Sequence, residues 1–308
     1  RAKQVYDWLW SKNLHSIDEM TNLSKDLRDK ISKEFTINPI SVDLLQKSKD
    51  GTIKNGVKLH DGLMVESVLI PTESRTTACV SSQVGCSLNC EFCATAKLKR
   101  MRNLEVAEIV DQVALIDKQS KLYFDRPLSN IVFMGMGEPM MNYKNVVDAI
   151  KKITEEDGLG MSARRITVST SGIPKMMRML ADENLKVKLA LSLHSAIEHK
   201  RNEIMPFSTK FPLTEIMEAM QYWYSKTENR ITFEYCVWKG INDGDEDIKA
   251  LIKYCRQVPC KVNLIQYNPI GEGKFDHRSV EAEERYVREL EKAGITVLVR
   301  RSRGGDID

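Results

Sequence analysis

Four of the chain's seven cysteines fall within residues 79–93, "CVSSQVGCSLNCEFC". Cys86, Cys90 and Cys93 form a C-x3-C-x2-C run, and Cys79 stands seven residues before it. Such short spacings let three thiolates from one loop approach a single metal centre. Three ligands suit either an iron–sulfur cubane with one open iron or a zinc ion that lacks its fourth ligand. If Cys79 supplied a fourth thiolate, a closed zinc site would also fit.

The composition is typical of a globular protein and gives no sign of export. The 308 residues are 42% hydrophobic and 29% charged, with a net charge of +3. No apolar run approaches the roughly 18 residues of a membrane span, and no signal peptide is visible. Clustered cysteines then favour metal binding or catalysis over structural disulfides. We expect a cytoplasmic monomer without membrane association, in which Cys236, Cys255 and Cys260 are buried or partly buried structural residues.

From about residue 76 onward, short β-rich runs alternate with helical stretches, which predicts a parallel sheet covered by helices. The β-rich runs are 76–81, 131–135, 165–170, 187–193, 231–238, 262–267 and 295–300. The helical stretches are 104–119, 144–156, 174–183, 213–225, 245–256 and 279–293. Six or seven units fall short of a complete eight-unit barrel, so an open barrel and a doubly wound sheet both fit. In either fold, ligands bind at the carboxyl ends of the strands.

The segment before this pattern predicts two smaller parts. Residues 1–48 are expected to form a helical accessory domain, in which Ser24 caps a helix with apolar residues at i, i+4 and i+8. Residues 49–75 are expected to form a β-hairpin linker, with Asn55-Gly56 as its two-residue turn. The stretch "LMVESVLI" is a strand candidate within that linker.

Small and polar residues follow successive β-rich runs at the predicted ligand edge. The run ending at residue 135 leads into "GMGEP", where glycine lets the backbone approach a ligand and Glu138 can accept from an ammonium group. Later runs end at Ser169, at Ser192–His194 and at Asn268. Each of these alone fits an ordinary turn or structural residue. Their occurrence at successive strand ends favours a shared ligand site.

The cysteine run resembles that of the radical S-adenosylmethionine (SAM) superfamily, with the aromatic Phe92 directly before the third thiol. Over nearly its whole length, the chain also resembles the RlmN/Cfr family of RNA adenine C2-methyltransferases. The segments that carry this resemblance are "CVSSQVGCSLNCEFCAT", "FMGMGEPMMN", "STSG", "LSLHS", "MPF", "YNPI" and "RRSRGGDID". Pro139 in "GMGEP" and the "RSRG" near the end favour the RlmN branch of the family.

The resemblance implies a fold and two cofactors. Cys86, Cys90 and Cys93 would hold a [4Fe-4S] cluster whose open iron binds SAM, and two SAM molecules would be used per turnover. A fourth thiolate would block the open iron, so Cys79 is not expected to be a ligand. The residues that match the family's SAM contacts are Gly137, Glu138, Ser169, Ser192, Leu193, His194 and Asn268. The expected fold is a partial (β/α)6 barrel over residues 76–308, preceded by the helical domain and hairpin linker.

The resemblance also implies a reaction. The family methylates C2 of adenine in 23S rRNA and in the anticodon arm of tRNA, through a methyl-cysteine and a covalent enzyme–RNA adduct, and requires an external one-electron donor. Cys79 matches the thiol that releases the RNA and ends in a disulfide, and Glu66 is the candidate base. An apolar strand face around Glu66 would make its carboxylate a stronger base. The methyl-carrying cysteine is expected beyond Asp308, so these 308 residues are expected to bind SAM without completing methyl transfer.

Two other classes of protein remain open from the sequence. One is a radical SAM enzyme that acts on a small molecule or a protein, and the other is a non-enzymatic metal-bound RNA-binding module. Arg100, Arg102 and Arg301 are candidate phosphate contacts, although a net charge of +3 does not by itself indicate nucleic acid. RNA binding with a steep salt dependence would favour the methyltransferase over an enzyme with another substrate.

Overall fold

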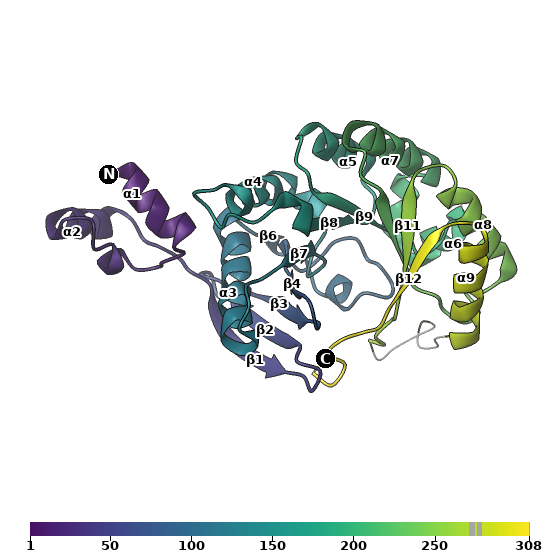
Figure 1. Cartoon of the computed structure of the whole chain (residues 1–308), viewed down its shortest axis with the longest axis horizontal. Helices are drawn as coiled ribbons and strands as arrows, with labels where there is room; N and C mark the ends of the chain where they lie inside the picture. The colour runs from purple at the N-terminus through teal and green to yellow at the C-terminus, as the bar shows by residue number, and fades with distance from the viewer. Residues whose placement is uncertain (271–274, 276–278, 308) are drawn as a thin grey trace.

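In the computed structural model, which describes residues 1–270, 275 and 279–307, seven strands run parallel and in chain order across one sheet (Figure 1). They are β4 (Thr76–Cys79), β7 (Asn130–Phe133), β8 (Ile166–Thr170), β9 (Lys188–Ser192), β10 (Ile231–Tyr235), β11 (Cys260–Ile265) and β12 (Thr296–Arg300). Because this order never reverses, the sheet is an open barrel and not a doubly wound sheet. The partial (β/α)6 barrel predicted from the sequence is confirmed.

Helices cover the outer face of this sheet (Figure 1). They are α3 (Val106–Phe124), α4 (Tyr143–Thr154), α5 (Pro174–Asp182), α6 (Glu198–Ile204), α7 (Leu213–Thr227), α8 (Asp245–Cys255) and α9 (Val280–Lys292). The core lies between sheet and helices, where side chains such as Leu189, Leu191 and Phe233 are fully buried. The sequence predicted every one of these helices except α6, whose seven residues, "EHKRNEI", carry too little apolar periodicity to be recognised.

Three antiparallel strands extend the barrel beyond β4: β3 (Met64–Pro71), β2 (Ile53–Lys58) and β1 (Ser41–Lys47). The predicted strand "LMVESVLI" is confirmed as β3, but two neighbouring predictions are wrong. Asn55-Gly56 lies inside β2 and not at a turn, because the buried Asn55 amide exchanges hydrogen bonds of 3.0 and 2.7 Å with Gln119. The chain reverses at residues 48–52 instead.

The other wrong prediction is the helix expected up to residue 48, because residues 41–47 form β1. This edge strand is mostly exposed and is defined by backbone pairing to β2, so its side chains leave little periodic signal. The preceding helical part consists of α1 (Ala2–Tyr6), a π-helical turn, a 3-10 turn and α2 (Lys25–Glu34). Ser24 does occupy the N-cap of α2, but its side chain makes no capping hydrogen bond, and Phe35 is exposed beyond the helix end.

A C-terminal segment, residues 301–307, leaves β12 and returns to the turn between β1 and β2 (Figure 1). We call it the strap. The Gly304 backbone N–H donates to Asp50 Oδ2 over 3.0 Å, and the Lys49 N–H donates to Asp306 Oδ2 over 3.1 Å. The strap therefore joins the two edges of the open barrel. Asp308, the last residue of the "RRSRGGDID" motif, lies outside the described residues.

No helix within the described part of the chain combines the length and the apolar character that crossing a bilayer requires.

Candidate functional site

The cysteine run lies in a loop that follows β4 and is closed at its base by two short paired strands, β5 (Gln83–Val84) and β6 (Arg102–Asn103). Gly85 sits at this base with φ +72°, and a Cβ there would approach the Lys99 carbonyl oxygen to 2.3 Å. Only glycine fits this close crossing of two backbone segments. The base of the loop is therefore fixed before any metal binds.

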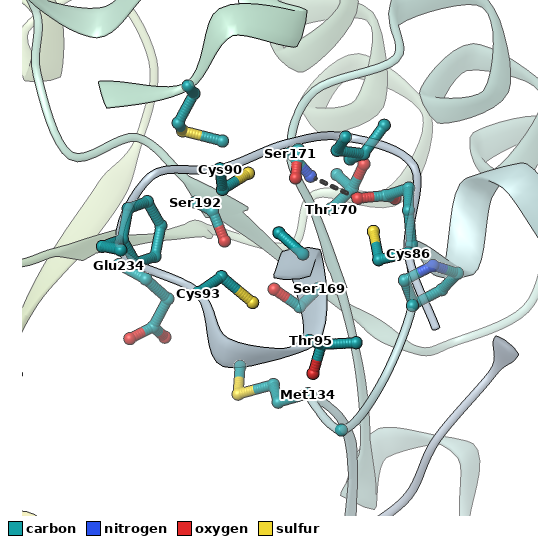
Figure 2. Close-up of a pocket in the computed structure, with 18 of the residues that line it drawn as sticks. Cys86, Cys90, Cys93, Thr95, Met134, Ser169, Thr170, Ser171, Ser192 and Glu234 are labelled. Carbon is teal, nitrogen blue, oxygen red and sulfur yellow. Dashed lines mark hydrogen bonds between the residues drawn. The ribbon is translucent and has the colours of Figure 1, made fainter. Parts of the chain in front are cut away.

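The three predicted metal ligands line one cavity of about 280 Å³ at the carboxyl edge of the sheet. Figure 2 shows the sulfur atoms of Cys86, Cys90 and Cys93 on different sides of this space. Burial raises the pKa of Cys86 and of Cys90, and the charges of neighbouring thiolates add to the effect. These two thiols are protonated in the free protein, and a metal that binds them must displace their protons.

The donor set fits an iron–sulfur cluster better than a single ion. Bonds of about 2.3 Å to one zinc ion would bring three sulfurs almost into contact. Within residues 1–270, 275 and 279–307, no group of three or more His, Cys, Asp or Glu side chains is arranged to hold one metal ion. A cubane spreads its iron atoms and takes thiolates that stand farther apart. All three thiols line the cavity, and Cys79 does not, so the predicted set of three ligands and no fourth fits this geometry.

The "GMGEP" loop after β7 forms one wall of the cavity and is attached to the cysteine loop. The Glu138 backbone N–H donates to Gln83 Oε1 over 2.8 Å, and Gln83 Nε2 donates to Asn103 Oδ1 over 2.8 Å. Gly137 has φ +92°, and a Cβ there would lie 2.4 Å from the Gln83 Cβ. Glycine is thus required where these two loops touch, which couples the position of Glu138 to the metal-binding loop.

Glu138 is a buried carboxylate that faces the cavity. Its Oε1 accepts the Met140 N–H over 3.1 Å. Its Oε2 accepts the Ser171 N–H over 2.8 Å, the hydrogen bond dashed at Ser171 in Figure 2. Burial raises the pKa of Glu138, and these hydrogen bonds oppose the rise. A carboxylate held in this way keeps free lone pairs with which it can accept hydrogen bonds from a cationic ligand.

His194 follows β9 and also lines the cavity. Its Nδ1 accepts the Cys236 backbone N–H over 3.2 Å, so the neutral ring carries its proton on Nε2. Burial, together with the charge of Arg201, lowers the pKa of His194 to about 3. The ring packs edge-on against Phe92, with centroids 4.6 Å apart, which gives the aromatic residue before the third cysteine a structural role.

The structure brings most of the predicted SAM contacts together, but not all of them. Gly137, Glu138, Ser169, Ser192 and His194 line the cavity with the three thiols. Leu193 is fully buried in the core, where its backbone N–H donates to the Glu234 carbonyl over 3.0 Å. Asn268 is exposed after β11 and is not among the lining residues. The roles assigned to these two residues stay predictions from the family.

Cys79 and Glu66 lie outside the cavity but next to each other. Cys79 pairs with Val68 across β3 and β4, so Glu66, two residues from Val68, shares its face of the sheet. Burial raises the pKa of Cys79 to about 12, opposed by the Met134 N–H and supported by the charge of Glu66. The apolar surroundings expected for Glu66 are not found: its side chain is 56% exposed, with Oε1 3.8 Å from Lys54 Nζ.

Sequence reasoning missed Arg201 in α6. Its side chain is fully buried, and its Nη2 donates to the Ser171 carbonyl over 2.6 Å, which ties α6 to the end of β8. No pattern in the sequence pointed to Arg201, because the helix that carries it was not recognised. Two of the candidate phosphate contacts are engaged elsewhere. Arg102 pairs with Glu108 through two bonds of 2.8 Å, and Arg100 donates to Asn103 Oδ1 over 2.9 Å.

Comparisons with known proteins agree with this geometry. A profile of the radical SAM superfamily matches residues 80–255, and one described as "Ribosomal RNA large subunit methyltransferase N-terminal domain" matches residues 1–37. A protein of Christiangramia forsetii named "Probable dual-specificity RNA methyltransferase RlmN" is 65% identical over 100% of this chain and 88% of its own length. The "Dual-specificity RNA methyltransferase RlmN" of Campylobacter fetus is 39% identical, over 100% of this chain and 90% of its own.

Among solved structures, a radical SAM methyltransferase from Sphaerobacter thermophilus superposes with a TM-score of 0.94 at 39% identity. The match covers 100% of this chain and 90% of that one. More distant radical SAM enzymes, such as the hydrogenase maturase HydG with a TM-score of 0.57 at 14% identity, share the fold alone.

Proposed function

Because the chain belongs to the RlmN family of radical SAM enzymes, we propose that it is a dual-specificity RNA methyltransferase that acts on C2 of an adenine in 23S rRNA and in tRNA. The observation that carries the proposal is the cavity in which three thiols from one loop face Glu138 and His194 across the carboxyl edge of the barrel. An RNA substrate and an external one-electron donor are the partners that this chemistry needs.

When bound, a reduced [4Fe-4S] cluster and SAM supply a 5′-deoxyadenosyl radical. This chain contributes the ligands and the walls of the site. Cys86, Cys90 and Cys93 would hold the cluster, and the hydrogen bonds through Gln83 would keep their loop in register with Glu138.

The same walls supply groups for the polar parts of SAM. Glu138 would accept from the SAM amino group, because its carboxylate faces the cavity with lone pairs to spare. His194 would donate through Nε2–H, because its Nδ1 is already engaged by the Cys236 N–H. The proposed SAM contacts also include Ser169, Ser192 and the Gly137 backbone, which line the cavity. The resemblance to the family alone assigns Leu193 and Asn268 to this set.

Cys79 and Glu66 are proposed to act on the RNA and not on the cofactors. Cys79 stays off the metal, where its thiol would resolve the covalent enzyme–RNA adduct. Glu66 would remove the C2 proton from the same face of the sheet. Its side chain is exposed, with Oε1 3.8 Å from Lys54 Nζ, and so is open to a substrate. This differs from the apolar surroundings that the sequence predicted.

The proposed function is tested by anaerobic reconstitution followed by an assay with RNA. The expected result is about four irons per chain, SAM cleavage on reduction, and 2-methyladenine in a ribosomal or transfer RNA fragment, detected by mass spectrometry. The part of the experiment that measures methyl transfer uses a protein in which the family's methyl-carrying cysteine is present after Asp308. One bound zinc and no SAM cleavage would contradict the enzyme assignment. Cleavage without methylated RNA would point to a radical SAM enzyme with another substrate.

A further inference from the structure

A second cavity, of about 800 Å³, lies in the barrel interior on the open side that the strap crosses. Nothing in the radical chemistry uses it. Residues from the early part of several strands line it, including Thr77 of β4, Thr167 of β8 and Thr232 of β10, together with the end of β12 and the first residues of the strap. In a closed barrel this space is filled by packed apolar side chains. Here it is lined by polar groups and open to solvent.

The lining is strongly cationic. Six basic residues contribute to it, Arg75, Lys188, Lys261, Arg300, Arg301 and Arg303, against a single carboxylate, Glu234. Glu234 is buried and accepts a hydrogen bond from Asn263 over 2.8 Å. Burial raises the pKa of Glu234, and this hydrogen bond and the charges of Arg300 and Lys261 oppose the rise. Among the described residues, only Arg301 of the six makes an ion pair, to Glu283 at 3.5 Å.

The cations repel one another in the free protein. Burial lowers the pKa of Lys261, and the positive charges of Lys188, Arg300 and Arg75 lower it further, while the charge of Glu234 opposes them. Lys188 and Lys261 project from the starts of β9 and β11, on either side of β10. Six cations around one lining carboxylate are an unfavourable arrangement that a bound anion would relieve.

The cationic cavity adjoins the cavity of the three thiols. Met134, Glu234 and Ile265 line both. A ligand could therefore place one group at the cofactor site while its neighbouring groups follow the cationic wall. A free phosphate would need only one closed pocket, whereas an open groove next to a reaction site fits a chain with several negative charges.

We propose that the cationic cavity binds the phosphodiester backbone of single-stranded RNA on the side of the target adenine, with Lys188 and Lys261 as phosphate contacts. The inference rests on the proposed function and adds to it the surface that orients the RNA. The target base would enter the thiol-lined cavity, and the flanking nucleotides would pass along the inner wall beneath the strap. These contacts carry no sequence information and set register and affinity.

The test compares two double substitutions in the reconstituted holoenzyme. Lys188→Gln with Lys261→Gln removes both charges and keeps most of each side-chain stem. The matched control, Lys249→Gln with Lys253→Gln, removes two exposed lysines one turn apart on α8, on the outer face. Fluorescence anisotropy with a labelled RNA hairpin that has an unpaired adenine in its loop gives the binding constant from about 50 to about 200 mM KCl.

Loss of two contacts to single-stranded RNA should lower the slope of log K against log salt by about 1.4, since each contributes about 0.7. At about 0.1 M salt this corresponds to about 25-fold weaker binding. The control pair should bind like the wild type. Cluster content and SAM cleavage without RNA should be unchanged in both variants, which verifies folding. A variant that keeps the wild-type slope overturns the inference.

Two further measurements separate the possible failures. If the wild type methylates the hairpin but the Lys188/Lys261 variant binds it normally, only the assignment of the cationic cavity fails. If the wild type neither binds nor methylates RNA, both the cavity assignment and the proposed function fail. Competition with inorganic phosphate and adenosine monophosphate tests the source of the phosphate. Displacement of the hairpin by either one at the affinity of the hairpin itself would assign the cavity to a small anion and overturn the RNA assignment.

Discussion

The five strands from β7 to β11 line both cavities of the barrel, yet the two cavities have opposite chemistry. In the thiol-lined cavity, ionisable groups are buried or half-buried: the pKa of His194 is about 3, and burial raises the pKa of Cys86 and of Glu138. In the cationic cavity, Lys188 and Arg300 are exposed. The same strands therefore present buried groups to one cavity and exposed basic groups to the other.

The difference follows from what covers each end. At the carboxyl ends of the strands, the cysteine loop and the "GMGEP" loop form walls of the cavity and are held together through Gln83. On the other side, the strap crosses the opening of the barrel. A site with buried walls strengthens electrostatic interactions with a bound cofactor, whereas an exposed cationic wall allows a charged chain to enter and leave. One sheet thus provides two environments.

The largest effect is expected from Cys86→Ala. Because two thiolates cannot hold the cluster that three thiols are placed to bind, the variant should lose the cluster and all SAM cleavage. Iron analysis and the visible absorption of the reconstituted protein measure this. Cys260→Ala is the matched control, since Cys260 is half-buried at the start of β11 and outside the thiol-lined cavity. Full iron content in the Cys86 variant would refute its role as a ligand.

Cys79→Ala should separate cofactor chemistry from RNA release. Because Cys79 lies outside the thiol-lined cavity, iron content and SAM cleavage should equal those of the wild type. With the methyl-carrying cysteine present after Asp308, a covalent enzyme–RNA adduct should accumulate and appear as a slower band on denaturing gels. A variant unable to assemble its cluster would instead identify Cys79 as a ligand.

Glu138→Gln should weaken SAM binding by about tenfold to a hundredfold, because the amide carries less negative charge and must turn one N–H toward the Ser171 or Met140 N–H. Isothermal titration with SAM under anaerobic conditions measures the change. Glu183→Gln, a carboxylate that pairs with Lys151 on the outer side of the barrel, is the control. Equal SAM affinity in the wild type and the Glu138 variant would remove Glu138 from the cofactor contacts.

His194 gives the thiol-lined cavity a pH signature. Its pKa is about 3 in the folded protein and 6.5 without burial, so the neutral ring adds stability that is complete above pH 6.5 and is lost as pH falls toward 3. In that interval this one group should lower the unfolding free energy by up to about 1.4 kcal/mol per pH unit. Urea unfolding at several pH values should show a shallower decline in His194→Gln than in the wild type. Identical slopes would mean that His194 becomes protonated in the folded state.

The smallest effect is expected at the strap, from Asp50→Ala. Although partial burial opposes it, hydrogen bonds from Thr52 and Gly304 lower the pKa of Asp50 to about 2, so the carboxylate is charged at neutral pH. Its loss should cost about 1–2 kcal/mol of stability and expose the strap to trypsin at Arg301 and Arg303. Limited proteolysis followed by mass spectrometry detects the cleavage. Unchanged protection of both arginines would show that the strap is held by other contacts.

Much of this arrangement was predictable from local patterns. The alternation of β-rich and helical segments predicted the parallel barrel, and glycine and proline in "GMGEP" predicted a tight turn after β7. The turn predicted at Asn55-Gly56 was wrong. This dipeptide favours turns, but the buried hydrogen bonds between the Asn55 and Gln119 side-chain amides hold it inside a strand. The residue pattern of β9 and β11 also contained a signal of the cationic cavity that was not recognised. Lys188 and Lys261 interrupt strands that would be apolar throughout if both faces were buried.

The sequence by itself determined the ligand chemistry, since the spacing of Cys86, Cys90 and Cys93 places three thiols in one loop whatever the rest of the chain does. It also determined the order of strands and helices, because both depend on local periodicity. Only the tertiary structure decided that Cys79 lies outside the thiol-lined cavity, that Glu66 is exposed, and that cations from distant strands meet in one cavity. Those outcomes depend on which face of a strand a residue occupies and on what packs over it, and neither is encoded within a short segment.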